Sequence, residues 1–149
     1  MIFPFTSRKK QGGAGGIGRG LFGGGYPPDS NVIDYVTIAS TGNATDFGDL
    51  TVARSFFAGC SSATRGVFGG GYNAGTSNVI DYVTIASTGN ATDFGDLTVS
   101  QYGVAGCSSA TRGLFGGGYA ASPSTVIDYV TIASTGNAID FGDLFSGRY

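Results

Sequence analysis

The chain contains no histidine, tryptophan or glutamate among its 149 residues, and only 12% of its residues are charged. Because charged residues make up about a quarter of an ordinary soluble protein, we expect Ser, Thr, Asn and Gly, together with contacts to other subunits, to cover this surface. Without histidine, Ser–His and Cys–His nucleophilic sites are excluded, and two cysteines alone cannot form a zinc site. The net charge of -2 provides no electrostatic footprint for nucleic acid.

Long apolar runs and paired cysteines are lacking as well. No stretch approaches the ~18 apolar residues of a membrane span, and the apolar part of the N-terminus is too short for a signal peptide. We therefore expect no membrane insertion. Cys60 and Cys107 occupy equivalent positions of neighbouring repeats, where a disulfide would need Cα atoms within ~7 Å. We interpret both cysteines as small buried hydrophobic residues, which suits a reducing compartment during assembly.

What the chain does contain is a repeated unit. Residues 19–26, RGLFGGGY, recur with at most one change as residues 65–72 and 112–119. Residues 31–52 are identical to residues 78–99, and residues 125–144 form a third copy that differs only at Thr125 and Ile139. Such fixed self-similarity is typical of solenoids, propellers and arrays, in which one repeat cannot bury its apolar face alone.

Each repeat divides into four segments of β character and none of helical character. In the middle repeat these segments are residues 56–60, 65–72, 79–86 and 93–99. They are rich in β-branched and aromatic residues and show no 3.6-residue spacing, while the sequence STGN supplies turn residues. The predicted fold class is therefore all-β.

The glycine triplets have no side chains to pack, so we expect neighbouring backbones to approach closely there, as strands do near an axis. Phe22, Phe68 and Phe115 precede the triplets and are expected to fill the core between adjacent sheets. The loops that follow the triplets differ in length and sequence, which indicates one exposed, variable face.

The order of an Arg-led strand, a glycine triplet, a strand with Tyr and an aromatic residue before Leu resembles the kelch repeat. Phe47, Phe94 and Phe141 stand where kelch blades usually carry Trp, and the strand Tyr follows its Asp instead of preceding it. The sequence segments FGGGY and VIDYVTIASTGNA also resemble the repeats of virion structural proteins of tailed marine phages. This resemblance implies kelch-like β-propeller blades, about residues 19–55, 56–102 and 103–149, in a virion protein assembled in the host cytoplasm.

Three blades are fewer than the 4–8 of a usual propeller, so we expect a homo-oligomer, most simply two chains that complete a six-bladed ring. A β-solenoid or a β-prism, in which three repeats would close by themselves, is the alternative architecture. Residues 1–18 form an N-terminal extension with a Gly-rich linker. We expect its Ile2, Phe3 and Phe5 to dock on another subunit or another virion protein, and a disordered tail is the alternative.

Aromatic and polar residues border the variable loops and form the candidate surface for a ligand or partner. They are Tyr26, Asp29, Tyr72, Asn73, Tyr119 and Ser122. Aromatic rings beside Asn and Ser suit stacking on sugars, such as host surface glycans. The alternative is packing at the edge of the core with the hydroxyl groups in water.

Repeated carboxylates are the remaining candidates for chemistry. Asp46 and Asp49, with their counterparts in the other repeats, could bind calcium or act as glycosidase carboxylates. A catalytic pair is needed once, whereas this pair occurs three times, so we expect structural roles. We expect Asp34, Asp81 and Asp128 likewise to be structural, paired with Arg19, Arg65 and Arg112. The GxGxxG sequence at residues 13–18 lacks the strand and helix that a dinucleotide site requires. We expect no metal and no cofactor.

The sequence therefore predicts a non-enzymatic virion structural protein on the phage tail or head surface, such as a tail fibre or capsid decoration. It would mediate protein assembly or host attachment. The alternative is a carbohydrate-binding adhesin that acts through the loops after each glycine triplet.

Overall fold

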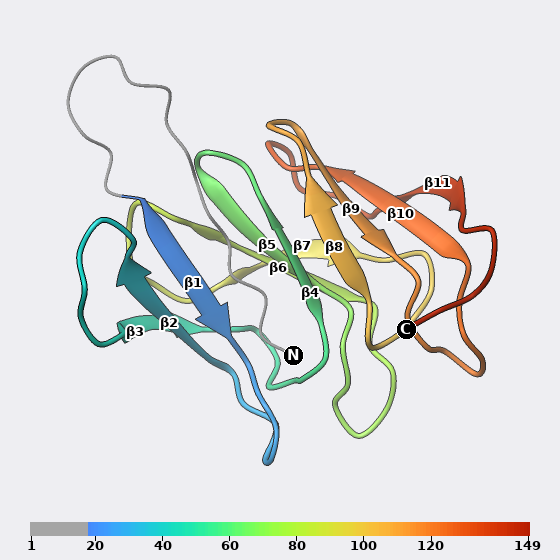
Figure 1. The fold of residues 1–149 in the computed structure, drawn as a ribbon, viewed down its shortest axis with the longest axis horizontal. Coiled ribbons are helices and arrows are strands. Elements are labelled where there is room, and N and C mark those ends of the chain that lie inside the picture. Colours follow the sequence, from blue (N-terminus) through green and yellow to red (C-terminus); the bar gives the residue numbers. More distant parts are fainter. Residues whose placement is uncertain (1–17) are drawn as a thin grey trace.

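The computed structural model describes residues 18–149, which form eleven β-strands in three antiparallel sheets and contain no helix (Figure 1). The first sheet consists of β1 (Arg19–Gly23), β2 (Val32–Thr37) and β3 (Thr45–Asp49). The second consists of β4 (Ala58–Ser61), β5 (Arg65–Gly69), β6 (Val79–Thr84) and β7 (Thr92–Asp96). The third consists of β8 (Ala105–Ser108), β9 (Arg112–Gly116), β10 (Val126–Thr131) and β11 (Ile139–Asp143). The predicted all-β class is confirmed.

Three strands of each sheet have the same arrangement, as their sequences require, and the second and third sheets carry one more strand, β4 and β8. Each runs as a meander in chain order, and each carries a β-bulge at the same place, between Ile33 and Asp34 in the first sheet. The bulge recurs between Ile80 and Asp81 and between Ile127 and Asp128. A bulge changes the direction in which the neighbouring side chains point. Because the bulge is at the same position in each sheet, equivalent side chains point in the same direction in all three sheets.

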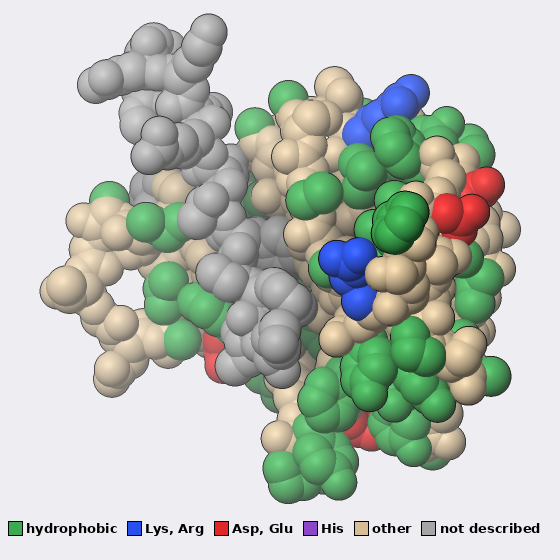
Figure 2. Space-filling model, turned by 45° about the vertical axis from the view of Figure 1, so that its right-hand side comes forward, with side chains coloured by type: hydrophobic (Ala, Val, Ile, Leu, Met, Phe, Trp, Pro, Cys, Tyr) green, Lys and Arg blue, Asp and Glu red, His purple; other side chains and the backbone are tan. Residues whose placement is uncertain are grey.

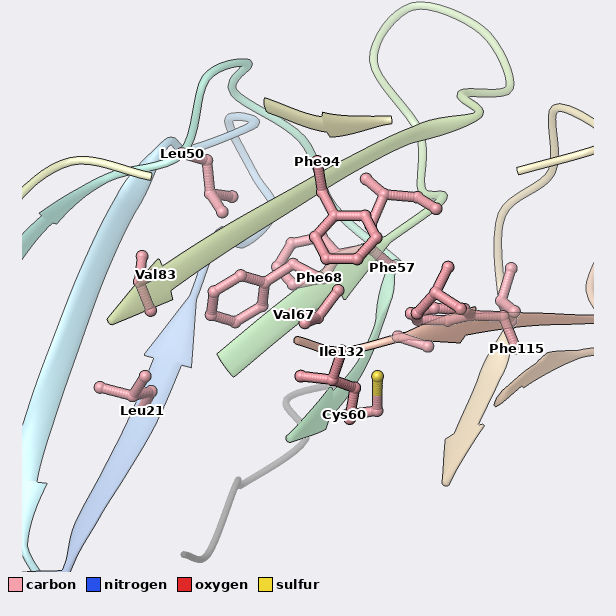
Figure 3. Packing of buried hydrophobic residues seen from close by; sticks show 14 of the residues in the cluster. Leu21, Leu50, Phe57, Cys60, Val67, Phe68, Val83, Phe94, Phe115 and Ile132 are labelled. Atoms are coloured by element: carbon pink, nitrogen blue, oxygen red, sulfur yellow. The ribbon is translucent and has the colours of Figure 1, made fainter. Parts of the chain in front are cut away.

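Neighbouring sheets lie side by side in chain order, and buried hydrophobic side chains from all three fill the spaces between them (Figures 1 and 3). Phe68 and Phe115 are buried between sheets, as predicted. A Cβ atom at Gly69 would lie 2.8 Å from the Phe115 ring, so the ring can pack there only because residue 69 has no side chain. Phe22 is only half-buried, because no described sheet lies on its side of β1.

The glycine triplets hold the segment that leads from one sheet to the next. Gly70 has a φ of 72°, which L side chains rarely adopt, and a Cβ there would lie 2.9 Å from the Gln101 carbonyl oxygen. The Gly71 amide donates a hydrogen bond to that same oxygen at 2.8 Å. The expected close approach of backbones is thus present, and it is made to the linking segment.

The first and third sheets are not joined to each other. The hydrogen bonds between sheets, among residues 18–149, connect the first to the second and the second to the third. Cys60 is accordingly buried under the third sheet, whereas Cys107, its counterpart on β8, is exposed because no described sheet covers it. The expectation that both cysteines are buried is wrong for Cys107; both are free thiols.

A change at Phe115 tests the packing between sheets. Phe115→Ala should lower the free energy of unfolding by about 3–5 kcal/mol, because the ring is completely buried (0% exposed) and its loss leaves a cavity against Gly69. Phe145→Ala is the matched control: this side chain is 104% exposed, so its change should stay within about 0.5 kcal/mol. Urea unfolding followed by circular dichroism measures both, and equal losses would contradict this packing.

Candidate functional site

Each pair of neighbouring sheets is joined by a seam of backbone hydrogen bonds. At the first seam the Gly89 amide donates to the Phe47 carbonyl and the Ala91 amide to the Asp49 carbonyl, both at 2.7 Å. In return the Asp49 amide donates to the Asn90 side-chain oxygen at 3.1 Å. The turn of one sheet therefore adds itself to the outermost strand of the sheet before it.

The second seam repeats these bonds with the equivalent residues. Gly136 donates to the Phe94 carbonyl at 2.7 Å, and Ala138 donates to the Asp96 carbonyl at 2.8 Å. The Asp96 amide again donates to an asparagine, Asn137, at 3.1 Å. From the sequence, the STGN segments are expected only to form turns. In the structure their Gly and Asn residues also bond to the preceding sheet and so hold the sheets together.

The strand-leading arginines contribute to the same seams. The guanidinium groups of Arg19, Arg65 and Arg112 lie 4.5–4.6 Å from the ring centres of Tyr35, Tyr82 and Tyr129. From this position Arg19 donates to the Ile85 carbonyl of the next sheet at 2.9 Å, and Arg65 donates to the Ile132 carbonyl at 3.0 Å. The predicted pairing of these arginines with Asp34, Asp81 and Asp128 is wrong, because each guanidinium stacks on the tyrosine of its own sheet.

Asp81 instead forms a buried ion pair with Arg54, which belongs to the segment between the first two sheets. Arg54 Nη1 lies 2.7 Å from Asp81 Oδ2, and both side chains are completely buried. Burial lowers the pKa of the Arg54 guanidinium, and the Asp81 carboxylate partly offsets that shift. The Thr51 hydroxyl also donates to Asp81. The equivalent Asp128 accepts from the Thr98 amide at 2.9 Å and hydroxyl at 2.7 Å, but Gln101 replaces the arginine there.

A row of aromatic rings follows the end of the sheets that carries the variable loops. Its members belong to all three repeats: Tyr26, Phe56, Tyr102, Tyr119 and Tyr149. Successive ring centres are 5.3–6.3 Å apart, and Tyr72 packs edge-on against Tyr102 at 5.6 Å. We call these six rings the aromatic row.

Phe56 occupies its place in the aromatic row at a conformational cost. Its φ is 53°, which a bulky L residue adopts rarely, and the equivalent residue of the next repeat is Gly103 with a φ of 68°. Strained residues of this kind persist where the surrounding structure or a function requires them. Here the strained residue presents its ring between Tyr26 and Tyr102.

The structure brings the predicted surface residues to one end of the sheets, where the three variable loops project (Figure 1). Three of them, Tyr26, Tyr72 and Tyr119, belong to the aromatic row. Asp29 accepts a hydrogen bond from the Ser55 hydroxyl at 2.6 Å, while Asn73 and Ser122 are exposed. Ile2, Phe3 and Phe5 lie outside the described residues.

Sequence reasoning missed three members of the aromatic row: Phe56, Tyr102 and Tyr149. Tyr102 and Tyr149 occupy the same position of their repeats, which is a signal that the repeat alignment contains. Phe56 gives no such signal, because its counterpart is Gly103.

The repeated carboxylates show no arrangement of a metal site. Within residues 18–149 no group of three or more His, Cys, Asp or Glu side chains is placed to hold a metal ion. Asp140 accepts the Gly142 amide at 3.1 Å, and Asp143 accepts the Thr125 hydroxyl at 2.8 Å, both within the third sheet. These two carboxylates thus accept hydrogen bonds from nearby groups of their own repeat.

The same residues include no helix long and apolar enough to cross a membrane. No protein-family model matches the chain, and no curated protein is significantly similar to it. Its role must therefore be inferred from its own surfaces.

The buried ion pair gives a test with a control inside the chain. Asp81→Asn should cost about 3–5 kcal/mol of stability, because it leaves the Arg54 charge buried without a partner. Asp128→Asn removes the same carboxylate beside a neutral Gln101 and should cost about 1.5–3 kcal/mol. Denaturant unfolding compares the two variants, and a loss at Asp128 as large as that at Asp81 would contradict the role given to Arg54.

Proposed function

We propose that this chain is a non-enzymatic structural protein of a phage virion, with three kelch-like propeller blades and a ring that other copies complete. The observation that carries the proposal is an apolar face at each end of the stack that no other described sheet covers. Ile38 of the first sheet is 50% exposed, whereas its counterparts Ile85 and Ile132 are 4% and 0% exposed. At the other end Phe141 is 52% exposed, and its counterparts Phe47 and Phe94 are 2% exposed.

The bare end of the third sheet is visible from outside. Figure 2 brings this side forward and shows broad green patches of hydrophobic side chains with few charged groups among them. An open hollow of about 450 Å³ lies here, and most of its lining is apolar. Its walls include Ala105, Cys107, Leu114, Gly116, Ile127 and Leu144. Exposed apolar faces of this kind promote association.

Propeller blades explain these features together. The second and third sheets are four-stranded antiparallel meanders, which is the form of a blade, and three such units are fewer than the 4–8 of a closed propeller. Two copies would supply six. The resemblance of the repeat to phage virion proteins supports the location on a tail or head surface. A repeating, weakly charged chain with an exposed apolar face at each end suits a building block for assembly or host attachment.

The mass of the native protein tests this proposal. Native mass spectrometry at micromolar concentration should find an oligomer, most simply with twice the 15.0 kDa mass of the chain. A folded monomer that persists across the micromolar range would contradict the proposed assembly role.

A second candidate function, a carbohydrate-binding adhesin, is favoured by the aromatic row. Its rings lie beside exposed polar residues of the variable loops, such as Asn73 and Ser122. Tyrosine offers a flat apolar face for a sugar ring together with a hydroxyl for hydrogen bonds. The strained Phe56 extends this surface from the first repeat to the second.

Glycan-array binding tests this second candidate. If the row binds sugars, the wild-type chain should bind defined glycans, and Tyr72→Ala combined with Asn73→Ala should abolish that binding. Thr88→Ala, an exposed change in the loop between β6 and β7 and outside the row, should leave it intact. No binding by the wild-type chain, or equal binding by all three proteins, would contradict the adhesin.

A further inference from the structure

We infer that copies of this chain join head to tail, with the bare face of the third sheet docking on the bare face of the next copy's first sheet. The contact would repeat the two seams inside the chain. This inference rests on the proposed function, because it specifies the joint by which a ring would be completed. Below, this contact is called the joint.

The backbone groups of a third seam are present on the two faces. The carbonyls of Phe141 and Asp143 are the counterparts of those that accept from the next sheet at both internal seams. On the first sheet, the amides of Gly42 and Ala44 are the counterparts of the donors, and the Asn43 side chain corresponds to Asn90. All three of these first-sheet residues are exposed.

The arginine contact is likewise divided between the two faces. Arg112 stacks on Tyr129 in the same way that Arg19 and Arg65 stack on their tyrosines, with its guanidinium 4.6 Å from the ring centre. Its counterparts donate to the carbonyls of Ile85 and Ile132 in the following sheet. The third residue of that series is the exposed Ile38 of the first sheet, so Arg112 would donate to Ile38 of the next copy.

The hollow in the third sheet lies where, at each internal seam, a phenylalanine ring of the following sheet packs. At the internal seams Phe68 lies against Gly23 and Phe115 lies against Gly69. Gly116 is the next glycine in this series and lines the hollow, where a Cβ atom would meet only Ile127 of its own sheet. Phe22 is the third member of the series formed with Phe68 and Phe115, and it is half-buried. Phe22 of the next copy would therefore enter the hollow.

Cys107 lines the hollow, so its exposure to solvent depends on whether the hollow is filled. At the second seam the Cys60 sulfur lies against Gly113 of the following sheet. Cys107 is its counterpart and lines the hollow, and Gly20 is the counterpart of Gly113. In the joint, Cys107 would be covered by Gly20 of the next copy.

Charge complementarity fixes the direction of the joint. Arg148 stands at the repeat position of Arg54, and Asp34 stands at that of Asp81. Arg148 is exposed, and its guanidinium donates to the carbonyl and the hydroxyl of Ser146, each at 3.3 Å. Docked as at the first seam, Arg148 of one copy would pair with Asp34 of the next.

The two faces are different surfaces, so the joint is heterologous, and such contacts form a ring when the rotation closes. Two copies around a twofold axis would contain two identical joints. Each copy would then give its third sheet and receive on its first.

Charge reversal in separate chains tests the joint. Arg148→Asp alone and Asp34→Arg alone each place like charges in both joints of a dimer, and each should weaken self-association by about tenfold or more. Mixed in equal amounts, the two variants should form a heterodimer, because one joint has the reversed pair and the other has the wild-type pair. Native mass spectrometry distinguishes heterodimer from homodimer by mass, and because rescue requires two chains, pairing within one chain cannot produce it.

Controls make each outcome decisive. Asp93→Arg carries the same charge change on an exposed residue of the middle sheet and should associate like the wild type. Thermal melting checks that every variant is folded. An oligomeric wild type whose two reversed variants fail to rescue each other would overturn the joint and leave the assembly proposal standing. A monomeric wild type would overturn both.

Alkylation by iodoacetamide gives a second, independent measurement. Cys107 should react several times more slowly in the wild-type oligomer than in the Arg148→Asp variant, since the joint covers it. Cys60 is the internal control: burial, and to a lesser extent the neighbouring Cys107, raise the pKa of its thiol to about 12, so it should stay unreactive in both. Equal reactivity of Cys107 in the two proteins would contradict the joint.

Discussion

The seam between neighbouring sheets is the interaction on which the rest of this structure depends. Each sheet has three or four short strands and an apolar face that a single repeat cannot bury alone. The seam supplies what each sheet lacks: two backbone hydrogen bonds and an asparagine contact from the next turn, a stacked arginine, and a phenylalanine that packs on a glycine. Because every repeat carries both halves of this set, a sheet uses one half on each neighbour. The stability of the fold is therefore approximately the sum of the contributions of its sheets and seams, as in other repeat proteins.

Additivity also explains the ends of the stack. No described sheet lies against the turn residues of the first sheet. In the third sheet, Phe141 and Arg112 pack on Tyr129 of their own sheet, and no described sheet lies beyond them. Natural repeat proteins usually place polar caps on such ends, but here Ile38 and Phe141 remain half exposed. The proposed assembly role follows from this difference. The aromatic row follows the end with the variable loops, and its last ring, Tyr149, also lines the hollow of the third sheet, so the two surfaces meet at that residue.

Much of this fold could be predicted from the sequence, because the period fixes which residues are equivalent. The strands, the turn at STGN and the packing of Phe68 and Phe115 follow from β-branched alternation and from the need to bury each sheet. The partners of charged residues could not be predicted in this way. Arg65 stacks on Tyr82 of its own sheet, and Asp81 pairs with Arg54 of the preceding linker, since the bulge and the packing of sheets decide which groups meet. The repeat alignment also gave a wrong prediction for Cys107. Cys60 and Cys107 occupy equivalent positions, but only Cys60 has a described sheet packed over it, so only Cys60 is buried.

The most direct measurement of the central claim is amide hydrogen exchange at Gly42 and Ala44, followed by NMR as the protein concentration is raised. The counterparts of these amides, at Gly89 and Ala91, donate to the preceding sheet at 2.7 Å and should be protected at every concentration. If the two ends of the chain are halves of the same seam, Gly42 and Ala44 should become protected as copies associate. Fast exchange at both residues in a sample shown to be oligomeric would contradict the account.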